Sequence, residues 1–204
     1  MNVKQILLTM AAAAMAMTLT ACKEDYGKVE QGRAIAFDKD KKEVTLIHDS
    51  AMDPQKPVYD VLPPSVFKLP TDPKETGPEP KAGQRLKLDT DKKIIVIFDT
   101  NTQKIVEVPI TIVDLQQPVD KEHPLVYDKA EKKAKKFPAV DKEKKTITIY
   151  SGRQKMLCTF SVPDQYFSYP DSTWDAGDEV RLYYKTAGQS LRFMNISKTD
   201  IFKK

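Results

Sequence analysis

Apolar and polar residues alternate along several short segments of the chain, a period of two that is typical of half-buried β-strands. The clearest case is Thr146–Tyr150, in which Ile147 and Ile149 alternate with threonine and tyrosine. Similar segments lie at 86–99, 104–114 and 190–197. Pro109, within the second of them, indicates a sheet edge or a bulge, because proline cannot donate a hydrogen bond to a strand ladder. The pattern predicts an all-β fold.

Three short blocks occur twice in the chain, in the same order. They are AFDKDKKEVTLI (36–47) and AVDKEKKTITIY (139–150), LPPSVFKLP (62–70) and VPDQYFSYP (162–170), and AGQRLKL (82–88) and AGDEVRLYY (176–184). Six of the twelve positions in the first pair are identical. Three matches in one order indicate an internal duplication.

Each repeat contains about five short segments of strand pattern, and closing them into a small barrel removes exposed strand edges. We therefore predict two tandem OB-like β-barrel units from the duplication, at 30–114 and 137–204. The segment 115–136 is polar and contains prolines, so we expect a linker with one helical turn near 128–136. Within the first unit, 53–81 holds eight of the 14 prolines and is expected to be an extended loop.

The N-terminal segment has the pattern of a secretory signal. Lys4 is followed by the apolar stretch Ile6–Leu19, which is too short and too rich in alanine for a membrane span. Leu19-Thr20-Ala21-Cys22 resembles the bacterial lipobox, which implies a cleaved signal peptide at 1–21 and a lipid on the Cys22 thiol. The tether 22–29 would follow. The alternative is an ordinary signal with a chance cysteine.

A lipidated Cys22 implies a lipoprotein anchored in the membrane and facing the periplasm. Several acyl chains make a stable anchor, whereas a single chain is marginal. Lys23 stands where enteric sorting to the inner membrane would use aspartate, so by analogy we favour the outer membrane. We expect an envelope protein as the partner.

Charge and composition narrow the function. The net charge is +4, and lysines alternate with acidic residues along the chain, which does not favour nucleic-acid binding. The carboxylates occur mostly in Asp-Lys turns, and no catalytic or nucleotide-binding spacing is found, so we expect no enzymatic activity. With Cys22 lipidated, Cys158 has no cysteine partner within the chain.

Met156 and Cys158 lie two residues apart, which places both on the same face of a strand. A thioether and a thiol suit Cu(I). The alternative is that both are core residues, since methionine and free cysteine are often buried. We otherwise expect no cofactor.

GRAIAFDKDKKEVTLIHD (32–49) resembles the opening hairpin of the small OB-fold periplasmic copper-binding proteins of metal-efflux systems. The matching residues are Gly32, Asp38, Val44, Thr45, Leu46 and His48. The resemblance implies an OB-like fold and a copper site at His48, to which Met52 is a second candidate ligand. The family's Trp-Pro-x-Met-x-Met segment has no counterpart in this chain.

Aromatic residues gather at 164–178, a loop-like stretch marked by proline. Tyr169 and Trp174 are the candidates for an exposed binding surface, with packing as the alternative. The leading hypothesis is a non-enzymatic binding or scaffold lipoprotein. The second is a periplasmic module that binds a soft metal or a small ligand.

Overall fold

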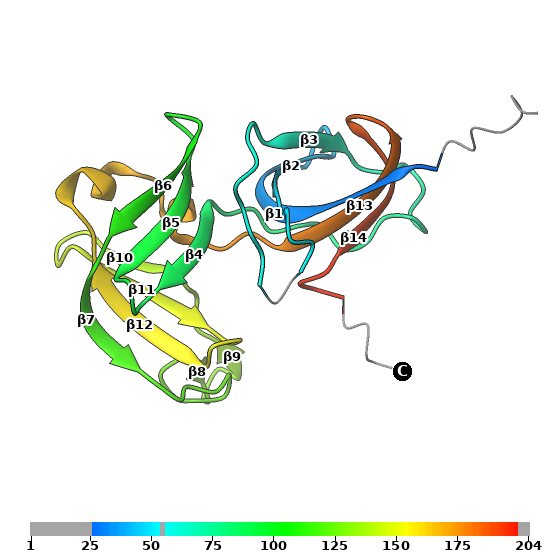
Figure 1. Ribbon diagram of the computed structural model, residues 1–204. Coiled ribbons are helices and arrows are strands. Elements are labelled where there is room, and N and C mark those ends of the chain that lie inside the picture. The colour runs from blue at the N-terminus through cyan, green and yellow to red at the C-terminus, as the bar shows by residue number, and fades with distance from the viewer. Residues whose placement is uncertain (1–25, 54–55, 200–204) are drawn as a thin grey trace, which may run out of the picture.

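The computed structural model describes residues 26–53 and 56–199, whose strands form two bodies (Figure 1). One body is a closed barrel, referred to below as the barrel. Its strands, in the order of their hydrogen bonding, are β1 (Lys28–Asp38), β13 (Glu179–Thr186), β14 (Gln189–Asn195), β3 (Ser65–Lys68) and β2 (Glu43–His48). The all-β prediction is confirmed, whereas the predicted signal peptide and Cys22 lie outside the described residues.

The other body consists of two sheets and is referred to as the two-sheet body. One sheet has the order β10 (Ala139–Asp141), β11 (Thr146–Ser151), β12 (Met156–Ser161), β7 (Thr111–Gln116), and the other β4 (Arg85–Asp89), β5 (Ile94–Asp99), β6 (Lys104–Pro109). They share one apolar core, in which Ile95 and Ile97 pack with Ile147, Ile149 and Phe160. The alternating isoleucines of the sequence are therefore the inward faces of β5 and β11.

The two repeats exchange strands. β13 and β14 belong to the second repeat, yet they complete the barrel that β1, β2 and β3 begin. In return, β4 and β5 of the first repeat pack against β10–β12. The expectation that 30–114 and 137–204 each close on themselves is therefore wrong. A pattern within one strand fixes which face is buried but does not choose the partner strand.

The chain passes between the bodies at the third repeated block. Gln84 and Ala176 form an antiparallel bridge, and the amide of Arg85 donates to the carbonyl of Asp175 at 3.0 Å. A Cβ atom on Gly177 would lie 1.8 Å from the carbonyl oxygen of Ala34, and one on Gly83 would lie 2.3 Å from that of Asp175. Both repeats carry Ala-Gly here because the two backbones touch where they cross.

The first repeated block is a shared hairpin turn. Asp38 Oδ1 accepts the amides of Asp40 and Lys41, and Asp141 Oδ1 accepts that of Lys144. Amide donors of the turn are the main cause that lowers the pKa of both carboxyl groups. Four residues after each aspartate, a lysine has a left-handed backbone. The same arrangement recurs from Asp89 to Lys93, Asp99 to Gln103 and Asp128 to Lys132.

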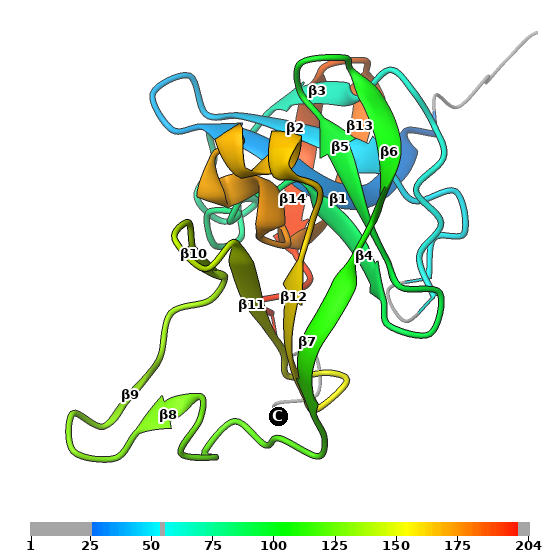
Figure 2. The ribbon, with the colours of Figure 1, turned by 90° about the vertical axis from the view of Figure 1, so that its left-hand side faces the viewer.

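Three loop predictions can be compared with the structure. Within 115–136, a small hairpin of β8 (Tyr127–Asp128) and β9 (Lys133–Ala134) replaces the expected helical turn, because Asp128 caps a hairpin turn (Figure 2). The loop 53–81 is interrupted by β3, which closes the barrel. Of the edge or bulge predicted at Pro109, the edge is confirmed, since Pro109 ends β6, the outer strand of the sheet β4-β5-β6.

Gly177→Ala should destabilise the protein strongly, because the new methyl group meets a backbone carbonyl that cannot move without breaking the crossing. We expect a loss of about 3 kcal/mol in the free energy of unfolding, measured with urea. Gly152→Ala is the control, since its Cβ would be 3.6 Å from the nearest atom and the change should stay within about 1 kcal/mol. Equal unfolding midpoints for the two variants would refute the steric role of Gly177.

Candidate functional site

The residues predicted to bind metal lie in two separate places. His48 ends β2, and its Nδ1 is 3.9 Å from Oε1 of Glu30, an atom pair for which no hydrogen-bond partner is found among the described residues. Met52 lies in the turn that follows and is 37% exposed. Met156 and Cys158 belong to the other body, so the four candidate ligands do not come together.

Met156 and Cys158 share one face of β12, as predicted, and that face is turned into the core of the two-sheet body. Burial raises the pKa of the Cys158 thiol to about 11, so the group is a neutral thiol at pH 7. In the described part of the chain, no cluster of three or more His, Cys, Asp or Glu side chains is arranged to hold a metal ion. Both side chains are core residues, which was the alternative to a metal site.

The proposed exposed surface of Tyr169 and Trp174 is wrong for the tryptophan. Trp174 is 1% exposed, because the short 3-10 turns η2 (Asp164–Ser168) and η3 (Asp171–Trp174) fold back over the core. Tyr169 is half-buried, and its hydroxyl donates to Oδ2 of Asp99 at 3.2 Å. The polar and proline-rich surroundings had indicated an exposed loop, whereas the loop covers the core.

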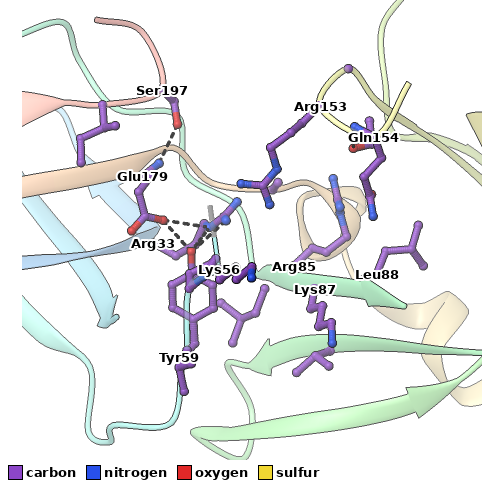
Figure 3. Close-up of a pocket in the computed structure, with 18 of the residues that line it drawn as sticks. Arg33, Lys56, Tyr59, Arg85, Lys87, Leu88, Arg153, Gln154, Glu179 and Ser197 are labelled. Carbon is purple, nitrogen blue, oxygen red and sulfur yellow. Dashed lines mark hydrogen bonds and ion pairs between the residues drawn. The ribbon is translucent and has the colours of Figure 1, made fainter. Parts of the chain in front are cut away.

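A cleft of about 950 Å³ is lined by residues of both bodies (Figure 3). The barrel contributes Arg33 and Glu179, and the segment 56–59 forms one wall. The two-sheet body contributes β4 and the turn 151–154 between β11 and β12. Sequence reasoning missed this site because its walls come from segments far apart in the chain, which the strand exchange brings together.

The cleft is strongly basic. Among the described residues, its lining holds one carboxylate, that of Glu179, and five basic side chains: Arg33, Lys56, Arg85, Lys87 and Arg153. Figure 3 shows side chains reaching into the cleft from β1, β4 and the β11–β12 turn. Lys87 has an ion pair at 3.0 Å with Asp89 and remains 60% exposed. The sequence did contain a signal for this site, because the third repeated block includes the basic residues of RLK (85–87). That these residues line a cleft follows only from the crossing of the two segments.

The carboxylate of Glu179 is already engaged within the protein. Tyr59 donates its hydroxyl proton to Oε2 of Glu179 at 2.5 Å, and Arg33 donates to the same hydroxyl oxygen from Nε and Nη2 at 3.1 and 2.8 Å. Arg33 Nη1 also donates to the carbonyl of Gly177 at 3.1 Å. Burial raises the pKa of Glu179 against the opposing effect of these donors. The network fixes Arg33 at one wall of the cleft.

The positive charge of Arg85 is compensated less completely than that of Arg33. Its Nε donates to the carbonyl of Trp174 at 2.9 Å. Burial, and then the charge of Arg33, lower the pKa of its guanidinium to about 10, and Asp175 acts in the opposite direction. Asp175 is in turn paired with Lys81, at 2.6 Å between Oδ2 and Nζ. The cleft therefore holds the half-buried guanidinium of Arg85 beside that of Arg33. The carboxylate that compensates Arg85, that of Asp175, is shared with Lys81.

Tyr59→Phe should lower the free energy of unfolding by about 1–3 kcal/mol at pH 7, because the carboxylate of Glu179 loses a buried donor. The pKa of Glu179 lies above its usual 4.5 in the folded protein, so the stability it contributes is present below pH 4.5 and is lost as the pH rises through the folded pKa. Removing the donor raises that pKa further.

We therefore expect a larger effect of Tyr59→Phe at pH 7 than at pH 4, measured by urea unfolding at both. Tyr127→Phe in the β8–β9 hairpin is the control and should cost less than about 0.5 kcal/mol. A loss that is the same at both pH values would mean that the Tyr59 hydroxyl stabilises the fold independently of the charge on Glu179, through its bonds with Arg33.

No helix among residues 26–53 and 56–199 is long and apolar enough to cross a membrane. Comparison with curated proteins and with solved structures gives no match. A family model described as a domain of unknown function (DUF4881) matches residues 25–204 and so spans both bodies, their crossing and the cleft. The chain belongs to the DUF4881 family.

Proposed function

We propose that the protein is a non-enzymatic binding protein whose cleft between the two bodies takes an anionic ligand. The observation that carries the proposal is the charge of the lining, which has five basic side chains and one carboxylate in the described part of the chain. Guanidinium and ammonium groups form charge-assisted hydrogen bonds with phosphate and carboxylate oxygens, about twice as strong as neutral ones. A concave site with low-dielectric walls also concentrates such ligands.

The arrangement of the cations supports binding over surface solvation. Arg33 is held by Tyr59 and by the carbonyl of Gly177, and Arg85 by the carbonyl of Trp174. Side chains fixed before the ligand arrives lose less rotamer entropy on binding. The mutual repulsion of Arg33 and Arg85, which contributes to the lowered pKa of Arg85, is relieved when an anion lies between them.

A binding role also accounts for Glu179 without an acid–base function. Its Oε2 accepts from Tyr59 and lies 3.6 Å from Nε of Arg33, so the carboxylate serves to position the arginine. Burial keeps the pKa of the Tyr59 hydroxyl far above its usual value, which leaves it a proton donor to Glu179.

We propose that this cleft lies close to a membrane surface. The lipobox resemblance puts the lipid on Cys22, and β1 begins at Lys28, six residues later. Six residues span at most about 21 Å when extended, so a lipid on Cys22 would hold the barrel close to the bilayer. We propose the periplasmic side of the outer membrane as the location, with an envelope protein as partner.

Lipidation predicts that the wild-type protein incorporates an alkyne-tagged palmitate in cells and that Cys22→Ser abolishes the label. The serine variant should also move from the membrane fraction to the soluble periplasmic fraction. Cys158→Ser is the matched control and should keep the label, because Cys158 is buried in the core. Equal labelling of the wild type and the Cys22→Ser variant would refute the anchor.

Anion binding predicts that pyrophosphate, titrated calorimetrically at constant ionic strength, binds the protein and that Lys56→Gln/Lys87→Gln weakens it five- to tenfold, at about 0.5–0.7 kcal/mol per exposed charge. Both lysines are exposed, so the fold should be unaffected. Lys104→Gln/Lys185→Gln removes the same charge outside the cleft and should leave the affinity unchanged. The absence of pyrophosphate binding, or an equal loss in both double variants, would contradict the site.

A further inference from the structure

The lining of the cleft has an apolar part as well as a charged part. Apolar side chains share its lining with the basic ones: Val58, Leu88, Val96 and Ile196. Val58 is 45% exposed, on the same segment as Lys56 and Tyr59, and Val96 on β5 is partly buried. Exposed aliphatic groups beside cations form a surface that water solvates poorly and that a ligand with an apolar part can cover.

The size of the cleft also favours a ligand that is larger than a single anionic group. A volume of about 950 Å³ lies in the range of pockets that enclose a whole small organic molecule, far more than one phosphate group needs. Once an anionic group lies between Arg33 and Arg85, part of the remaining wall is apolar or belongs to the alkyl stems of lysine, beside the polar side chains of Ser151, Gln154 and Ser197. The rest of the ligand must therefore be compatible with aliphatic surface.

The aromatic rings of the lining are already occupied. The Arg33 guanidinium carbon lies 5.2 Å from the centre of the Tyr59 ring, and the Tyr150 ring packs against Phe137 at 6.1 Å. Neither is positioned as a free platform for a planar base or sugar. The open apolar contacts come from Val58 and, less exposed, from Val96 and Ile196, which suit a flexible alkyl chain.

We propose that the cleft binds a phosphate-bearing amphiphile. The phosphate lies between Arg33, Arg85 and Lys56, and the alkyl part covers Val58 and Val96. Phosphate is favoured over a single carboxylate because two guanidinium groups from different elements, with a nearby ammonium, match several oxygens and more than one negative charge. This inference rests on the proposed function, since it names the chemical class of the anion that the cleft takes.

The test compares inorganic phosphate, butyl phosphate and hexyl phosphate as probes. The full chain carrying Cys22→Ser is used, so that no attached lipid competes, and binding is measured calorimetrically at constant ionic strength. Each fully buried methylene strengthens binding about fourfold, so partial burial predicts hexyl phosphate to bind about tenfold more tightly than butyl phosphate. Hexanol, which lacks the anion, should not bind.

Two variants separate the parts of the ligand. Lys56→Gln/Lys87→Gln should weaken all three phosphates. Val58→Ser should reduce the gain from the longer chain about threefold and leave inorganic phosphate unchanged. Because Val58 is exposed, its substitution should not disturb the fold.

The outcomes distinguish the inference from the function on which it rests. Equal affinities along the series, still weakened by the lysine substitutions, would overturn the amphiphile and leave the anion site intact. No binding of any phosphate would overturn both. Vesicles of phosphatidylglycerol and of phosphatidylcholine identify the source: competition by the anionic vesicles alone indicates a membrane lipid, and binding of hexyl phosphate without such competition indicates a soluble alkyl phosphate.

Discussion

Two polypeptide segments cross between the bodies at van der Waals distance, and this crossing determines which strands meet. Gly83 and Gly177 let the segments approach until Arg85 and Asp178 donate their amides to the carbonyls of Asp175 and Lys81. A side chain at either glycine would separate the backbones. The first repeat could then not deliver β4 and β5 to the second body, nor the second repeat deliver β13 and β14 to the barrel.

The exchange also fixes the two bodies against one another. Where they meet, Ile35 and Ile47 of the barrel pack with Leu86 and Phe98 of the two-sheet body in a separate apolar cluster. Ala34 faces the barrel core and its neighbour Ile35 is buried at this contact, as alternation requires, and a register shift in β1 between Ala34 and Ala36 turns Phe37 to the barrel core as well. A bulge of this kind redirects one side chain without ending the strand. The walls of the cleft are therefore held in place by this packing as well as by the two segments that cross between the bodies.

The sequence carries local information well and long-range pairing poorly. Alternation identified the strands around Ile95 and Ile147, and the Asp-Lys turns identified the hairpins, because both signals lie within a few residues. Partner choice was not recoverable, since β13 and β4 come from equivalent blocks and either could complete the barrel. Trp174 was misjudged for a related reason. Its burial depends on the core that the folded-back turn covers, whereas proline and polar neighbours describe only the turn.

The chemistry of the cleft follows from the same geometry. Arg85 lies directly after the crossing, so the segment that joins the bodies also carries a cation into the space between them, while Glu179 begins β13 on the other crossing segment. Glu179 binds Tyr59 and thereby orients Arg33, whereas Arg85 shares the charge of Asp175 with Lys81. A carboxylate at salt-bridge distance from Arg85 would have neutralised the one cation that the crossing segment brings between the bodies. The positive charge is instead concentrated where both walls are held in place, and hydrogen bonds to Tyr59 and to the carbonyl of Trp174 fix the two guanidinium groups there.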